Sequence, residues 1–305
     1  MIGFLDLEFN SDSDFKSERT DYSIVEIAFV IVEDIESFKS IESYHTYCKP
    51  CMNDGKIRDR VTRITGITQE QIDSGVTLDT AISDIDCILE RYEVSEIYTW
   101  SDAENHVFQF NKKFVSEENK KRVKAIISKL KDGQLYFEKK IGIKDNISLQ
   151  NALILCGMDK RVRHSSLSDC EDMQMVLIHS IKHDVPKANI FKYTEYVELR
   201  NKYYAIRQTF RYFAQNGIDN DEVIQFIIDR DLGFNFEKYL KEYDTQKLNI
   251  LKAKFTNVFN DSLLLNITHK MDLKKFLERI KDNNDVCSFR DYCIDESNFF
   301  KMDNN

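Results

Sequence analysis

Two acidic residues stand two positions apart inside the apolar segment 2–10, near the start of the chain. The density of Phe and Leu there predicts a buried strand, in which residues i and i+2 share a face. Asp6 and Glu8 therefore point the same way, opposite to Leu5 and Leu7. Neighbouring carboxylates in an apolar strand repel each other and resist burial. A divalent cation would relieve this conflict because hard cations prefer oxygen ligands. An edge strand with one solvated face is the alternative.

Two further groups of polar residues have spacings that suit the same chemistry. Asp102 and Glu104 follow a short expected strand, at its turn into a helix that Ser101 or Asp102 could cap. His164 stands five positions before Asp169, on the loop and first turn of another expected helix. Carboxylates suit a divalent metal, and a histidine, with an ordinary pKa of about 6.5, suits proton transfer near neutral pH.

The elements that must position these residues follow from the hydrophobic pattern. Three apolar or alternating segments within the first 50 residues predict an antiparallel meander. Downstream, helical spacing alternates with short strand-like segments at 97–100 and 134–137, which predicts an α/β fold with a mixed sheet. From about residue 190 onward Tyr and Phe become frequent and the spacing stays helical. This predicts an all-helical second domain in which the aromatic residues form the core.

The composition narrows the class of protein. The chain has 305 residues, of which 42% are hydrophobic and 31% are charged, and its net charge is −9. These values suit a globular protein with room for two domains, and no segment approaches the roughly 20 apolar residues of a membrane span. The chain starts without a basic segment ahead of an apolar one, so no signal peptide is expected. Seven cysteines, an odd number, favour free thiols in a reducing cytoplasm.

One stretch of this acidic chain is basic. Such a stretch is most often a solvated helix face, and a track for nucleic-acid phosphates is the alternative. The overall charge argues against a general nucleic-acid binder, although a metal-dependent nuclease can be acidic because its metals supply positive charge. The basic residues are Lys112, Lys113, Lys120, Lys121, Arg122, Lys124, Lys129 and Lys131.

Five short motifs stand in order along the first 185 residues. They are Phe4-Leu5-Asp6-Leu7-Glu8, Cys48-Lys49-Pro50, Ile64-Thr65-Gly66-Ile67-Thr68, Ser148-Leu149-Gln150-Asn151-Ala152 and His164-Ser165-Ser166-Leu167-Ser168-Asp169. Together they resemble the DEDDh superfamily of 3′–5′ exonucleases, which includes RNase T and proofreading exonucleases. The resemblance is greatest to ERI-type RNA exonucleases and bacterial sporulation-inhibitor-type exonucleases. It implies an RNase H-like fold for residues 1–185 and leaves 186–305 as a helical C-terminal domain of unassigned role.

The resemblance implies an enzyme that hydrolyses single-stranded nucleic acid from its 3′ end, with RNA favoured over DNA, and releases nucleoside 5′-monophosphates. Two Mg²⁺ or Mn²⁺ ions would be bound, with Asp6 bridging both and with Glu8 and Asp169 on one of them. A third acid would hold the other ion through water. His164 would take the proton from the attacking water.

The third acid is the position at which the sequence departs from the family pattern. The family usually has an Asp four residues after the Trp, and here that position is Glu104. Apolar residues three and four positions later, Val107 and Phe108, favour Glu104 over Asp102, which could instead cap the helix. A Glu in this place could bind metal or weaken the site. The alternative function is therefore a weak or inactive nuclease-fold protein that binds nucleic acid, or binds a protein partner through its C-terminal helices.

Overall fold

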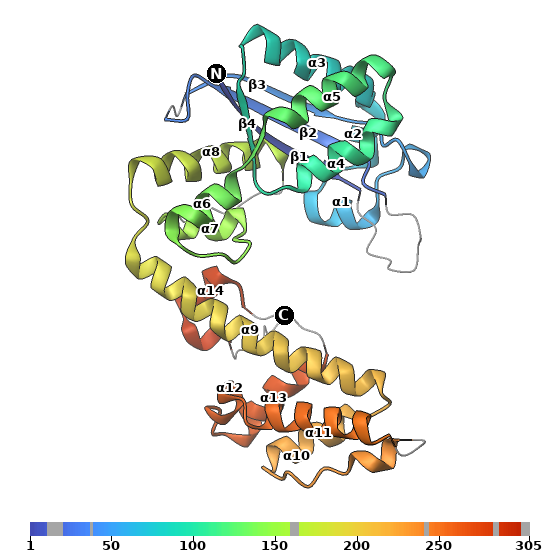
Figure 1. Ribbon diagram of the computed structural model, residues 1–305, viewed down its shortest axis with the longest axis vertical. Coiled ribbons are helices and arrows are strands. Elements are labelled where there is room, and N and C mark those ends of the chain that lie inside the picture. The colour runs from blue at the N-terminus through green and yellow to red at the C-terminus, as the bar shows by residue number, and fades with distance from the viewer. Residues whose placement is uncertain (11–20, 37–38, 159–164, 241–243, 283–286, 300–305) are drawn as a thin grey trace. The chain divides into compact units, whose positions relative to one another are not determined.

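The computed structural model describes residues 1–10, 21–36, 39–158, 165–240, 244–282 and 287–299 (Figure 1). The chain divides into two compact units, Met1–Asn189 and Ile190–Asn305. Within the described residues, no helix is both long enough and apolar enough to cross a membrane.

The N-terminal unit is built on one five-stranded sheet. Its strands are β1 Ile2–Phe9, β2 Ile24–Val32, β3 Ser40–Tyr47, β4 Glu96–Thr99 and β5 Leu130–Asp132. The strand order is β3-β2-β1-β4-β5 (Figure 1). The first three strands pair antiparallel, which confirms the predicted meander, whereas β1 with β4 and β4 with β5 pair parallel. This mixed sheet with flanking helices is the expected RNase H-like fold.

Eight α-helices and two short 3₁₀ turns accompany the sheet in the described part of this unit. The α-helices are α1 Asp59–Thr65, α2 Gln69–Ser74, α3 Leu78–Arg91, α4 Ala103–Asn111, α5 Glu117–Lys129, α6 Gly133–Ile141, α7 Leu149–Leu155 and α8 Ser166–Lys182. The 3₁₀ turns are η1 Asn53–Gly55 and η2 Lys112–Phe114.

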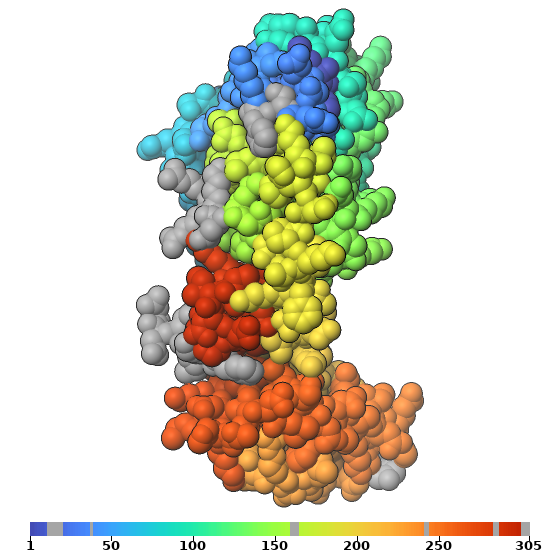
Figure 2. Space-filling view, turned by 90° about the vertical axis from the view of Figure 1, so that its left-hand side faces the viewer, coloured from blue at the N-terminus to red at the C-terminus, as the bar shows by residue number. Residues whose placement is uncertain are grey.

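Successive side chains of β1 point to opposite faces of the sheet and therefore contact different helices. Leu5 and Leu7 belong to the core cluster that also contains buried residues of α3 and α5. Asp6 and Glu8 point to the opposite face, where α8 lies against β1 and β2. Figure 2 shows the yellow-green side chains of α8 next to the blue ones of the N-terminal strands. The predicted separation of acids and apolar residues is therefore confirmed.

Local capping explains where two of these helices begin. The Ser148 side chain caps α7, as the sequence predicts, and Gly157 follows the helix with a φ of 78°. The expected strand at 134–137 is wrong because these residues lie in α6. Asp132 accepts a hydrogen bond from the backbone N–H of Leu135 at 2.8 Å and so starts a helix directly after β5.

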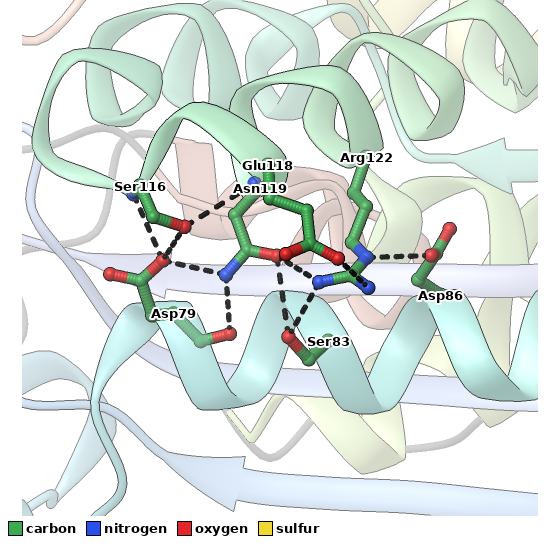
Figure 3. A network of polar contacts seen from close by, with 7 residues as sticks. All are labelled: Asp79, Ser83, Asp86, Ser116, Glu118, Asn119 and Arg122. Atoms are coloured by element: carbon green, nitrogen blue, oxygen red, sulfur yellow. Dashed lines mark hydrogen bonds and ion pairs between the residues drawn. The ribbon is translucent and has the colours of Figure 1, made fainter.

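A polar network joins α3 to α5 (Figure 3). Asp79, in the first turn of α3, accepts hydrogen bonds from Oγ of Ser116 at 2.8 Å and from Nδ2 of Asn119 at 2.6 Å. Arg122 of α5 donates to Asp86 of α3 at 2.8 Å. The N-terminal half of α5 is therefore fixed to α3, and one cation of the basic stretch is used to hold the helices together.

The C-terminal unit is helical in the residues described, as the sequence predicts. Tyr193, Tyr203, Phe210 and Phe213 are fully buried there, which confirms that the aromatic residues form a core. The elements are α9 Lys187–Gln215, α10 Asn220–Ile228, η3 Phe236–Tyr239, α11 Thr245–Phe259, α12 Ser262–Leu265, α13 Lys270–Lys281, α14 Phe289–Ile294 and η4 Glu296–Phe299.

Candidate active site

Three carboxylates from two elements meet on the face of the sheet that α8 covers. Asp6 and Glu8 come from β1, and Asp169 comes from the first turn of α8. One oxygen atom of each carboxylate lies within 4.8 Å of the other two, and all three residues are half-buried. The fold thus brings together two strand acids and one helix acid that are far apart in the sequence.

Of the two candidates for the further acid, Glu104 is buried and Asp102 is exposed. Glu104 is 5% exposed in the first turn of α4, and its negative charge contributes to the raised pKa of Asp6. Its Oε2 atom is buried and has no hydrogen-bond partner among the described residues. Asp102 instead accepts a hydrogen bond from Asn105 at 3.0 Å and pairs with His106 at 3.2 Å. The placement favours Glu104 as the further acid of the site, because a buried carboxylate oxygen without a hydrogen-bond partner is costly unless a cation lies beside it.

Asp6, Glu8 and Glu104 hold their protons more tightly than isolated carboxylic acids do, because their pKa values are raised. Loss of solvent around Asp6 raises its pKa well above the usual range, and repulsion from neighbouring acids raises it further. Burial, followed by repulsion from Glu26, raises the pKa of Glu8 to about 8. Burial also raises the pKa of Glu104 to about 7. Binding of a cation would favour the ionised carboxylates and release these protons.

The donor set fits a hard divalent cation such as Mg²⁺ or Mn²⁺. Asp6, Glu8, Asp169 and Glu104 all offer carboxylate oxygens, which these ions prefer. A cation would also offset the mutual repulsion of the acids. Cys170 follows Asp169 in α8, but its thiol is fully buried and is directed to the backbone oxygen of Ala28 on β2. Burial raises the pKa of this thiol well above its usual value, so it stays protonated and does not suit metal binding.

His164, the expected general base, lies outside the described residues. The helix that follows it begins at Ser166, and Asp169 donates its backbone N–H to the Ser165 carbonyl at 3.0 Å within the first turn. The description of the site therefore rests on the four acids alone.

The basic stretch is largely engaged with neighbouring side chains. Lys120 pairs with Glu117 at 2.6 Å, and Arg122 pairs with Asp86 at 2.8 Å. Lys113 lies over aromatic rings rather than beside an acid. The other residues expected to contact nucleic acid are half-buried or exposed, and they are Lys112, Lys121 and Lys124.

Glu26 is a further acid near the site that motif spacing does not identify. It lies on β2, where its Cα pairs with that of Glu8, and it is 2% exposed. The signal in the sequence is a single charge in a nine-residue strand, Ile24–Val32, whose other members are all apolar. Such a charge has to find partners inside the protein.

An RNase H-like sheet that carries an acidic centre on its first strand defines a protein of the nuclease class. The family model described as Exonuclease (RNase_T) matches residues 4–177, more than half of the chain, and the chain belongs to this family. The match confirms the resemblance seen in the motifs. No curated protein matches the chain at a significant level.

Several solved exonuclease structures are similar in outline. The nuclease domain of 3′hExo, a DEDDh family member bound to rAMP, has a TM-score of 0.48 and 15% identity, with 60% of this chain and 92% of that chain covered. A 3′-exonuclease from a study of histone mRNA stem-loop recognition has a TM-score of 0.48 and 16% identity, with 60% and 82% covered. Cell-death related nuclease 4 has a TM-score of 0.41 and 17% identity, with 59% and 63% covered.

Proposed function

We propose that this protein is a metal-dependent 3′–5′ exonuclease that removes nucleoside 5′-monophosphates from the 3′ end of single-stranded nucleic acid. The observation that carries the proposal is the convergence of Asp6, Glu8 and Asp169, with the buried Glu104 close by, in a member of the exonuclease family. RNA is favoured over DNA because the motifs resemble those of ERI-type enzymes. The activity would reside in residues 1–185, and residues 186–305 would form a separate helical domain.

Each acid has a distinct role in this proposal. Asp6 would bridge two Mg²⁺ or Mn²⁺ ions, Glu8 and Asp169 would bind one of them, and Glu104 would hold the other through water. When bound, the ions would orient the scissile phosphate and neutralise the charge that develops on it during hydrolysis. His164 would accept the proton of the attacking water. The water oxygen would bond to phosphorus as the bond between phosphorus and the 3′ oxygen of the preceding nucleotide breaks, and that oxygen would take a proton from solvent to become the new 3′ hydroxyl.

A row of aromatic rings at the end of β1 offers a surface on which a single-stranded substrate could lie. Ring centroids are 6.0 Å apart for Phe9 and Tyr22, 5.5 Å for Tyr22 and Phe110, and 5.8 Å for Phe110 and Phe114. The row starts at Phe9, which packs against the core cluster of Leu5 and Leu7 on the side of β1 opposite to Glu8, and its members Tyr22 and Phe114 are 38% and 37% exposed. Nζ of Lys113 lies 4.0 Å from the Phe110 centroid. Aromatic rings beside a cation suit the bases and phosphates of an unpaired strand.

Lys113→Ala is expected to weaken single-stranded RNA binding several-fold, because it removes a cation from this row. The logarithm of the binding constant falls linearly with the logarithm of the salt concentration. Loss of one phosphate contact makes this slope less steep by about 0.7 for a single strand. The measurement is fluorescence anisotropy of labelled RNA over a salt series, in a catalytically inactive background. Lys120→Ala is the matched control, because Lys120 already pairs with Glu117. Equal slopes for both variants and the parent would show that Lys113 touches no phosphate.

The metal-free protein is expected to lose thermal stability as the pH rises from about 5 to about 8. Above the ordinary Glu pKa of 4.5, the unfolded chain loses the Glu8 proton, whereas the folded protein keeps it until about pH 8. Rising pH therefore favours the unfolded state. Mn²⁺ should stabilise the protein more at pH 8 than at pH 5, since fewer protons compete for the carboxylates. Thermal unfolding with EDTA or Mn²⁺ at both pH values checks this, and an equal Mn²⁺ shift at both would contradict it.

The proposed substrate preference is tested by comparing single-stranded RNA, single-stranded DNA and duplexes of one sequence. The expected products are nucleoside 5′-monophosphates, identified by chromatography, with single-stranded RNA degraded fastest. Nucleoside 3′-monophosphates or internal cuts would rule out the proposed reaction. Absence of hydrolysis would favour a nuclease-fold binding module for nucleic acid or protein.

All seven cysteines are free, which supports the cytoplasm as the site of action.

A further inference from the structure

Glu26 is a buried acid that directly faces the acidic site. It lies in β2, its Cα pairs with that of Glu8 in the antiparallel register, and it is 2% exposed. Directly opposed residues of an antiparallel pair share a face, and like charges in such a pair are destabilising. Burying a second acid beside Glu8 therefore requires contacts that compensate for it.

Both carboxylate oxygens of Glu26 have such contacts. Oε1 lies 2.5 Å from Nε2 of His45 on β3. Oε2 accepts hydrogen bonds from the backbone N–H of Ser166 at 3.2 Å and from its Oγ at 3.0 Å. Ser166 is the first residue of α8, and the preceding N-cap residue, Ser165, makes no capping hydrogen bond with its side chain. Glu26 therefore caps α8 from another element, where the positive end of the helix favours a carboxylate.

A second contact fixes the same helix one turn further on. The Cys170 thiol donates to the backbone oxygen of Ala28 on β2 at 3.5 Å. Glu26 and Ala28 are two residues apart on the strand, and Ser166 and Cys170 are four residues apart on the helix. These separations correspond to about 6.6 Å along a strand and about 6 Å along a helix. The first turn of α8 is thus anchored along β2 at two matching points.

The anchors lie directly opposite the acids of β1. Ala28 pairs with Asp6, and Glu26 pairs with Glu8. Asp169 lies in the helical turn between the two anchors. We propose that Glu26 is a positioning residue, which holds the first turn of α8 so that Asp169 meets the two strand acids at a metal-binding distance. This inference rests on the proposed function, because that function assigns the metal to these acids.

Three variants of the full chain test the inference by calorimetric Mn²⁺ titration. Glu26→Ala removes the cap and is expected to weaken Mn²⁺ binding about 10- to 100-fold, as loss of groups that orient metal ligands does. Glu26→Gln keeps an oxygen that can accept from Ser166 and should retain most of the affinity. Glu138→Ala is the control, because Glu138 is also buried and accepts a backbone N–H, that of Ile147 at 2.8 Å. Its loss should leave Mn²⁺ affinity unchanged.

Two further readouts separate positioning from general destabilisation. Amide hydrogen exchange of the metal-free protein should become faster at residues 166–170 in Glu26→Ala and stay unchanged there in Glu138→Ala. In the hydrolysis assay at saturating Mn²⁺, Glu26→Ala should lower kcat with little change in KM for the oligonucleotide, and Glu26→Gln should restore most of the rate. If Glu26→Ala does not fold, Ser166→Ala removes the hydroxyl part of the cap and should give the same changes to a smaller extent.

Two results would overturn the inference. One is unchanged exchange at residues 166–170 in Glu26→Ala. The other is an equal loss of Mn²⁺ affinity in Glu26→Gln and Glu26→Ala, because Glu26 would then act through its charge alone. Failure of the proposed function can be distinguished from failure of this inference. If the parent protein hydrolyses no nucleic acid while Glu26→Ala still loosens the helix and weakens Mn²⁺ binding, positioning stands. If the parent binds no Mn²⁺, the inference is overturned too, because it assigns Glu26 the placing of Asp169 for metal binding.

Discussion

Asp6→Asn is expected to lower the rate of metal-dependent RNA hydrolysis by roughly a thousandfold or more. Asp6 is the most central acid of the site, because burial raises its pKa and the negative charges of Glu104, Asp169 and Glu8 each raise it further. An amide in its place cannot bridge two cations. Stabilisation of transition-state charge by bound metal contributes several kcal/mol, and each 1.36 kcal/mol corresponds to a tenfold change in rate. Single-turnover degradation of labelled RNA measures the loss.

The same variant should be more stable than the parent protein when no metal is present. Asn does not titrate, so it removes the free-energy cost of burying a carboxyl group whose pKa is raised by burial and by repulsion from its neighbours, while keeping the shape of the side chain. We expect the melting temperature in EDTA at about pH 8 to rise by about 3 °C, which corresponds to about 1 kcal/mol if the N-terminal unit, Met1–Asn189, unfolds by itself. Mn²⁺ should then add little further stability. A variant that loses activity and also melts earlier in EDTA would indicate a damaged fold and not a lost metal ligand.

Glu104→Gln and Asp102→Asn are expected to differ by roughly a hundredfold in hydrolysis rate. Glu104 is buried with an unsatisfied Oε2, and it belongs to the charges acting on Asp6. Groups that only orient metal ligands change activity 10- to 100-fold, so a ligand should matter at least as much. Asp102 is exposed and bonded to His106, so its replacement should cost less than about 0.5 kcal/mol, or about twofold.

This pair of variants shows which acid acts in the site, because both remove one carboxylate near the N-terminus of α4 and differ only in which one is removed. Steady-state rates at saturating Mn²⁺, together with thermal unfolding, separate catalytic from structural effects. A large loss in Asp102→Asn with near-normal activity in Glu104→Gln would reverse the assignment of the third acid. Glu104→Asp is a further useful variant, because it restores the residue that the family usually has. Higher activity in that variant would indicate that the longer side chain weakens the site.

The sequence predicts the acidic face of β1 and the meander because both depend on short periodic patterns. Alternation alone separates Asp6 and Glu8 from Leu5 and Leu7. The capping of α7 by Ser148 is equally local. Residues 134–137 resemble a strand in sequence because Tyr and Phe favour strands. They form a helix because the Asp132 side chain caps its N-terminus.

Contacts between distant elements are beyond what such patterns can predict. Ser166 and Glu26 are 140 positions apart, and only the folded chain brings the start of α8 to β2. The spacing of apolar residues suggests that Glu104 and not Asp102 is the third acid. Only the structure shows that Glu104 is the buried one of the two. Likewise, Arg122 is one of several similar cations in the sequence, and its bond to Asp86 separates it from the others.

The central claim is that these acids form the metal centre of a 3′–5′ exonuclease, and one assay tests it most directly. Single-stranded RNA labelled at its 5′ end is incubated with the 305-residue chain and Mn²⁺, alongside an EDTA control and Asp6→Asn. We expect a ladder of labelled products that shortens progressively from the 3′ end, and no ladder in either control. A labelled mononucleotide released at the first time point, or equal degradation by Asp6→Asn, would contradict the account.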